Sequence, residues 1–375
     1  MIVLALVCAA LPLLWMTALK RPDRDLVRDR AVQLCCWGLA LWLLTIEPFL
    51  AIGGMSVLLR WFDHETYTTR EYQPVVWCWL AAVGLWFGAR AVPVDVRPWI
   101  AGVWVTWGLV QGALSIGQWA ILRNHWSGWG SGWAIEPIHL YAGTFGQRSM
   151  TGAYVGLVFP LAFLLPSPAS WGVASGLLLA QVPICSWLGF LAMLVAGVVL
   201  QPRLAVPLSL LGLGLAVFVG WEWRAKHSVA GRATWLDRYT TRAGSLDSVF
   251  LRVRHWRRMW WVWRQWPVWV TGRGVGRGWR DAARVQAGRD PDLARLPRVQ
   301  AGHAHNDWIE VAYEHGLLGV AAMILLAFRV GAGVHWADPW TASAIAGAVL
   351  AAGTFSVRLA SLAAPWWIVL AWVAP

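Results

Sequence analysis

The stretch GHAHNDWIEVAYEHGLLGVAAMILLAFR, residues 302–329, joins a cluster of polar side chains to a long apolar run. Two histidines, an Asn-Asp pair and two glutamates stand before an apolar segment that is long enough to cross a bilayer as a helix. Titratable groups at a membrane boundary are costly unless they have a partner or a function. The stretch therefore predicts a membrane helix with a polar site at its beginning.

Similar apolar runs recur from one end of the chain to the other. Of its 375 residues, 58% are hydrophobic and only 13% are charged, which is too little polar surface for a soluble chain of this length. The composition predicts an all-α polytopic membrane protein with about 11 transmembrane helices. We expect these helices near residues 2–19, 31–53, 74–92, 98–121, 150–166, 170–185, 187–201, 204–221, 308–329, 338–355 and 357–374.

The positions of the basic residues predict the orientation of these helices. The short connector KRPDRDLVRDR, residues 20–30, carries five basic residues and should face the cytoplasm. Alternation then places the connector 90–97 and Arg203 on the same side. The loops on the other, external side are 54–73, 122–149 and 222–307.

The last of these loops divides the chain into three predicted parts. An N-terminal bundle of about eight helices spans 1–221, the loop 222–307 forms a large basic, mainly helical region, and about three helices follow in 308–375. Residues 222–306 hold sixteen Arg and one Lys against six acidic residues, a net charge of +11. An anionic substrate explains this charge, and a diphosphate fits best because Arg offers paired donors to phosphate oxygens. Attraction to anionic lipid headgroups is the alternative, whereas no motif indicates nucleic acid.

Within the loop, residues 249–266 are predicted to form an amphipathic helix in the membrane interface. Its apolar stripe consists of Val249, Val253, Trp256, Trp260 and Trp263. Arg252 lies on the apolar edge, away from the main basic face that includes Arg254. It is placed either to bind a specific partner or to extend to the headgroups.

The glycines that follow, from Gly272 to Gly278, allow tight turns or a close approach of the backbone to a ligand. No strand precedes them, which excludes a nucleotide-binding loop.

The polar part of residues 302–319 offers candidate catalytic groups. His305 is the best proton acceptor because it titrates near neutrality and has acidic neighbours, and His303 is the second choice. Glu310 and Glu314 lie one helical turn apart at the start of the predicted helix, where acidic side chains are also favoured electrostatically. A metal site formed by His303, His305 and Asp307 remains an alternative, although no second ligand cluster accompanies these residues.

Two further residues are candidates for the site. Asn306, one of only two asparagines in the chain, directly follows His305. Glu47 is predicted to lie near the outer end of the second span, where an ionisable group indicates a polar cavity. The 32 tryptophans are mostly interpreted as an interfacial aromatic belt, and the five cysteines as small buried apolar residues rather than disulfide partners.

These residues together resemble the O-antigen ligase and O-antigen polymerase superfamily of bacterial envelope glycosyltransferases. AHNDWIEVAYEHGLLG resembles the signature of that family. The run from Arg252 through Pro267 to Gly276 resembles the preceding part of its periplasmic loop. GTFGQRSMTGAYVGLVFPLAFLL, residues 143–165, resembles an earlier family segment, so that the resemblance covers roughly residues 140–330. Members often carry a diphosphate-binding arginine after a serine between two central helices. This chain has Cys185-Ser186-Trp187 there, and Arg148 is a candidate substitute.

The resemblance implies an activity and a location. It implies transfer of a glycan from undecaprenyl diphosphate to a hydroxyl of lipid A core or of another glycan, at the periplasmic face of the bacterial inner membrane. His305 would be the base, and Arg252 with nearby arginines would stabilise the diphosphate, without a metal or other cofactor. Glu310 would orient the imidazole or bind the sugar. Membrane lipids are the remaining expected partner.

A membrane transporter for an anion such as bicarbonate is the main alternative. It would use the arginines as a selectivity surface. The chain has no clear internal repeat, and its polar residues cluster outside the apolar runs, which favours the transferase. The choice between ligase and polymerase stays open, because both use the same lipid-linked donor and differ only in the acceptor.

Overall fold

The computed structural model describes residues 35–61, 69–122, 148–184, 187–201, 268–274, 306–353 and 360–375, together with single residues between 253 and 264. All secondary structure in this part of the chain is helical, as expected. Arg97–Gln118 and Asp307–Gly331 are long and apolar enough to cross a membrane, and several shorter apolar helices accompany them. The predicted spans 2–19 and 204–221 lie outside the described residues.

Most predicted helix boundaries agree with the structure to within a few residues. The N-terminal helices are α3 (Pro48–Trp61), α4 (Thr69–Ala91), α5 (Arg97–Leu122), α6 (Arg148–Val158), the 3-10 helix η2 (Phe159–Leu164), α7 (Ala169–Ile184) and α8 (Trp187–Leu200). The C-terminal ones are α12 (Val268–Thr271), α15 (Asp307–Gly331), α16 (Pro339–Ala351) and α17 (Ala360–Val373). The sequence explains several of these ends. Asp338, for example, accepts from the backbone N–H of Thr341 at 2.8 Å and Pro339 opens the first turn of α16.

The predicted second span, 31–53, is wrong as a single helix. Residues 35–43 are helical, residues 44–46 form a turn, and a new helix begins at Pro48. Proline restricts the residue before it to extended conformations and lacks the N–H that a continuous helix requires. Glu47 consequently lies in the break between two helices.

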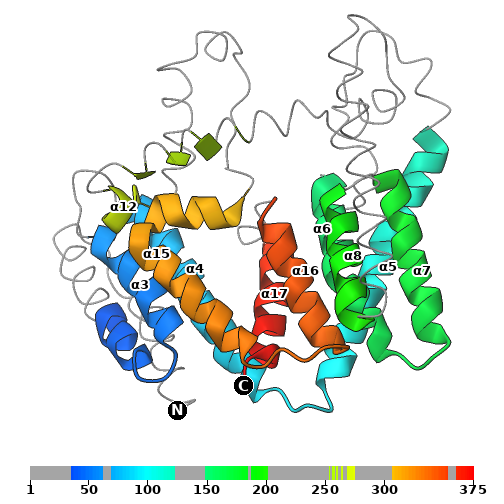
Figure 1. Ribbon diagram of the computed structural model, residues 1–375, viewed down its shortest axis with the longest axis horizontal. Helices are drawn as coiled ribbons and strands as arrows, with labels where there is room; N and C mark the ends of the chain where they lie inside the picture. The colour runs from blue at the N-terminus through cyan, green and yellow to red at the C-terminus, as the bar shows by residue number, and fades with distance from the viewer. Residues whose placement is uncertain are drawn as a thin grey trace, which may run out of the picture.

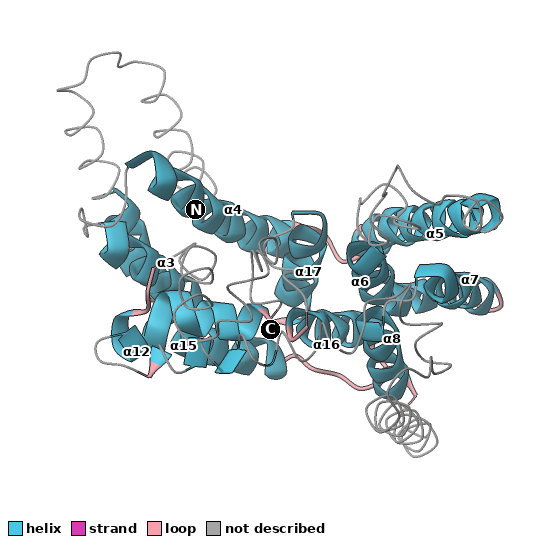
Figure 2. Cartoon of the chain, turned by 90° about the horizontal axis from the view of Figure 1, so that it is seen from above, coloured by secondary structure: helices cyan, strands magenta, loops and turns pink. Residues whose placement is uncertain are grey.

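The helices α16 and α17 lie at the centre of the molecule and join two groups (Figures 1 and 2). On one side α17 packs against α4, and α3 packs against α15; on the other side α16 packs against α8, which contacts α6. Helices α6 and α8 approach closely because a glycine of one faces a glycine of the other: a methyl group at Gly156 would meet the carbonyl oxygen of Gly189 at 2.9 Å. In the group that contains α3 and α4, the helices pack through aromatic rings. Phe49 of α3 packs edge-to-face on Trp86 of α4, with the ring centroids 4.8 Å apart.

Several tryptophans join helices instead of forming a belt. The indole of Trp79 donates to the carbonyl of Leu50 in α3, and that of Trp366 donates to Ala344 in α16. Trp372 donates to Ala89 at the end of α4. These carbonyls belong to helices, so each indole adds a second bond to an acceptor that has two lone pairs. The belt interpretation holds better for exposed rings such as Trp99, which is 79% exposed.

Candidate functional site

The candidate site is built on the first half of α15. Asn306 is the N-cap of this helix, and its side-chain oxygen accepts from the backbone N–H of Ile309 at 3.0 Å. Asp307 and Glu310 occupy the first turn, where backbone N–H groups that have no acceptor within the helix favour negative charge. The cap explains locally why the helix begins at this point in the sequence.

Three carboxylates lie on one face of this half of α15. Asp307, Glu310 and Glu314 follow each other at intervals of three and four residues, and they are 3%, 1% and 1% exposed. A buried carboxylate is costly unless cations or hydrogen bonds compensate its charge. All three have polar partners, and the sequence supplies arginines in abundance in the preceding loop. The stripe therefore concentrates negative charge next to the most basic part of the chain.

The basic segment packs against this half of α15 through apolar contacts. Met259 and Tyr313, which are 3% and 2% exposed, form a small core of their own, and Trp256 and Trp263 pack around it. The arginines Arg257 and Arg264 of the same segment are exposed. This agrees with the predicted amphipathic character, with one correction: Trp260 belongs to the predicted apolar stripe but is 60% exposed. It extends instead over Trp263, with ring centroids 4.8 Å apart.

A break inside α15 ends this first half. Gly316 has φ 59° and ψ −146°, a conformation that is essentially restricted to glycine, and the helix changes direction there (Figure 1). The carbonyls before the break then bond to another segment. The N–H of Arg273 donates to the carbonyl of Tyr313, and that of Gly274 donates to the carbonyl of Glu314, both at 2.8 Å. Residues 272–274 thus cap the end of the first half of α15.

Two glycines allow this contact between backbones. A methyl group at Gly272 (φ 71°) would collide with the carbonyl of Glu314, and one at Gly316 would collide with the backbone of Val270 and Gly272. The sequence prediction that this glycine string permits a close approach is consistent with the structure. The approach that the structure shows is to the helix of the candidate site.

The helix α3 holds the same break from the other side. Ser56 donates its hydroxyl hydrogen to the carbonyl of Gly53 at 2.7 Å, and its oxygen lies 2.9 Å from Nδ1 of His315. Because a hydroxyl has a single hydrogen, both bonds form together only when His315 donates through Nδ1. Sequence reasoning missed this pair because the two residues are 259 positions apart: His315 lies in the quoted signature but was not singled out, and Ser56 lies in no motif.

The other predicted site residues divide into two groups. His303, His305, Arg252 and Arg254 lie outside the described residues, and of Arg148 only its position at the start of α6 is described. Among the described residues no group of three His, Cys, Asp or Glu side chains is arranged to hold a metal ion.

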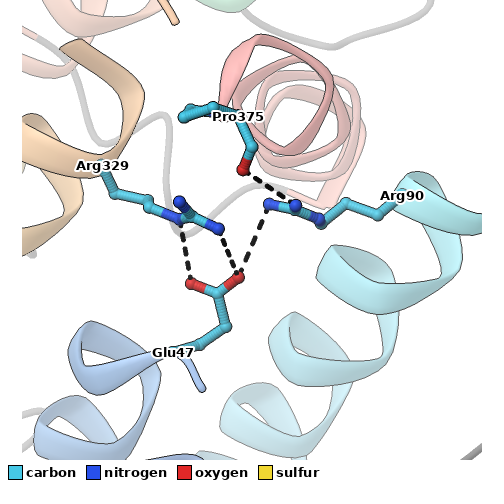
Figure 3. Close-up of polar contacts among 4 residues, drawn as sticks. All are labelled: Glu47, Arg90, Arg329 and Pro375. Atoms are coloured by element: carbon cyan, nitrogen blue, oxygen red, sulfur yellow. Dashed lines mark hydrogen bonds and ion pairs between the residues drawn. The ribbon is translucent and has the colours of Figure 1, made fainter. Parts of the chain in front are cut away.

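Glu47 lies at the other end of α15, where its carboxylate contacts Arg90 and Arg329 (Figure 3). Arg329 lies 13 residues beyond the break at Gly316, which is about 20 Å along the second half of α15. The prediction placed Glu47 at the outer end of a span, whereas the structure places it beside the connector after α4, which was predicted to face the cytoplasm. The proline break at 47–48 is the reason for this difference.

Comparison with known proteins adds one match. Residues 168–324 match a protein family described as O-antigen ligase, and this range includes the whole basic loop 222–307 and most of α15. The match supports the resemblance found from the sequence. No curated protein and no solved structure matches the chain.

Proposed function

We propose that the chain is a member of the O-antigen ligase and polymerase superfamily, whose family model matches residues 168–324, and that it is a membrane glycosyltransferase acting on undecaprenyl diphosphate-linked glycans. One observation carries the proposal beyond the family match. Asn306, Glu310 and Glu314 lie on a half-helix that packs directly against the arginine-rich segment. An acceptor hydroxyl needs a base and a diphosphate leaving group needs cations, and this contact supports the proposal because it joins the chain segments that carry the candidate residues of both kinds.

The proposed reaction is a single group transfer. His305 takes the proton of the acceptor hydroxyl, the oxygen attacks the anomeric carbon, and the bond from that carbon to the diphosphate oxygen breaks. Undecaprenyl diphosphate leaves with the electron pair. His303 is the second candidate for the base. No metal is assigned to any step.

The cations and the polar side chains have separate roles in this proposal. Arg252, Arg254 and Arg148 stabilise the charge that develops on the diphosphate, because guanidinium groups bind phosphate oxygens in pairs. Glu310 orients the imidazole or binds the sugar, and Asn306 and Glu314 bind glycan hydroxyls. We leave Glu47 out of this site because of its distance along α15.

The experiment is a transfer assay with purified protein, an undecaprenyl diphosphate-linked oligosaccharide and a lipid A-core acceptor, read on a gel. A shifted lipid A band indicates a ligase, and a ladder on the donor lipid indicates a polymerase. His305→Ala and Arg252→Ala should each lower transfer at least about a hundredfold, as loss of a base or of a charge-stabilising group does. His335→Ala and Arg257→Ala are the matched controls, because both side chains are exposed and outside the proposed machinery.

Each result has a definite consequence. Retained transfer in His305→Ala or Arg252→Ala removes that residue from the mechanism. Loss of transfer when a chelator is added indicates a metal and favours the alternative site of His303, His305 and Asp307. Absence of any product from folded protein with authentic substrates contradicts the transferase proposal and returns attention to the anion transporter, which neither the fold nor the family match supports.

A further inference from the structure

We infer that Arg90 and Arg329, held in place by Glu47, form a phosphate-binding site for the headgroup of an anionic phospholipid. The site lies at the end of the bundle where α4 and α15 finish, far from the proposed transfer site. It does not depend on the proposed function, and its ligand is different from the lipid-linked donor.

The geometry brings two guanidinium groups together on one carboxylate (Figure 3). Arg329 approaches with two nitrogens, Nε at 3.4 Å from Oε2 and Nη2 at 3.5 Å from Oε1. Nη1 of Arg90 lies 3.5 Å from the same Oε1. The nitrogens of the two arginines that share this oxygen are therefore at most about 7 Å apart, a spacing that one phosphate group can bridge.

The single carboxylate of Glu47 does not by itself balance the charges of Arg90 and Arg329. Glu47 supplies one negative charge to two guanidinium groups, and its contacts are longer than the 2.7–2.9 Å of a strong charge-assisted hydrogen bond. Arg90 also donates to an oxygen of Pro375 at 2.8 Å. A third arginine stands nearby, because Arg97 lies over the ring of Trp372 and that indole donates to Ala89, the residue before Arg90.

Exposure shows which of these groups a ligand can reach. The side chain of Glu47 is 5% exposed, whereas those of Arg90 and Arg329 are 31% and 36% exposed. The carboxylate therefore acts as an internal anchor, and the two arginine side chains remain partly accessible to a ligand. Arginine has five such donors in a fork that matches phosphate oxygens.

The surroundings favour a lipid headgroup over a soluble anion. Phe328, next to Arg329, is 73% exposed, and Trp336 and Trp99 on the same end are 66% and 79% exposed. Exposed aromatic rings next to arginines are typical of the level of the headgroups, and basic pockets between membrane helices bind anionic lipids there.

The test measures binding of phosphatidylglycerol to purified full-length protein in a neutral detergent, with phosphatidylcholine as reference lipid. We expect wild type to prefer phosphatidylglycerol. The double variant Arg90→Ala/Arg329→Ala should bind it at least about tenfold more weakly, since the loss of even one charged hydrogen bond contributes that factor. The matched double variant Arg257→Ala/Arg264→Ala removes two exposed arginines near the other end and should bind like wild type.

Glu47→Gln separates a binding site from a purely structural ion pair. It removes the internal negative charge, so that affinity for phosphatidylglycerol should rise severalfold even though the protein melts at a lower temperature. A purely structural role predicts lower stability with no gain in affinity, and that result from folded protein overturns the inference. Equal affinity for inorganic phosphate and for phosphatidylglycerol would overturn the lipid assignment and make the ligand a soluble phosphate.

Discussion

At the scale of single residues, Asn306 has two possible roles that substitutions can separate. Its side-chain oxygen caps α15, and its amide is also proposed to bind the glycan. Asn306→Ala should lower the free energy of unfolding by about 1 kcal/mol through loss of the cap, and should also lower transfer. Asn306→Ser should restore the stability because serine caps equally well. We expect Asn306→Ser to stay impaired in transfer, measured beside a thermal melt.

The opposite pattern would contradict the proposed role of Asn306. Full transfer by Asn306→Ser would show that the residue acts only as a cap. Asp338→Ser is the matched control, because Asp338 caps α16 in the same way and is not among the site residues. It should leave both stability and transfer close to the wild-type values.

At the scale of the elements, the break in α15 and the segment that caps it form one unit. Gly316→Ala should cost about 1–3 kcal/mol from backbone strain, with an added cost from collision with residues 270–272. Gly272→Ala should behave in the same way, because its methyl group would meet the carbonyl of Glu314. In proteins that remain folded we expect kcat to fall more than donor binding, because the half-helix with Glu310 moves relative to the basic segment.

Gly331→Ala is the control for these two substitutions. This glycine lies at the end of the same helix, and a methyl group there would meet nothing within 4 Å. It should leave both stability and turnover nearly unchanged. Wild-type kinetics in Gly316→Ala would show that the proposed position of the half-helix is not required for transfer.

The same elements show how far sequence reasoning reaches. The helix beginning at Asp307 is predictable because its cap, its acidic first turn and its apolar length are all local signals. The break at Gly316 is not, because a single glycine inside an apolar run is compatible with a continuous helix. Its cause is the segment around Gly272, and such a contact between distant backbones leaves no periodic pattern. The ion pairs of Glu47 escape prediction for the same reason, since Arg329 is 282 positions away.

At the scale of the whole molecule, the two ends of the bundle should face opposite sides of the membrane. The connector after α4, in which Val94 is 73% exposed, lies at the same end of the bundle as Arg90 and Arg329. The exposed Arg264 belongs to the segment that packs on the other end of α15. In a variant without its native cysteines, Arg264→Cys should react with an impermeant maleimide added to intact spheroplasts, and Val94→Cys should react only in inverted vesicles. Labelling of both from one side would contradict the predicted topology, and with it a transfer site on the periplasmic face. Labelling from opposite sides would place the proposed lipid site in the inner leaflet, where basic residues meet anionic headgroups.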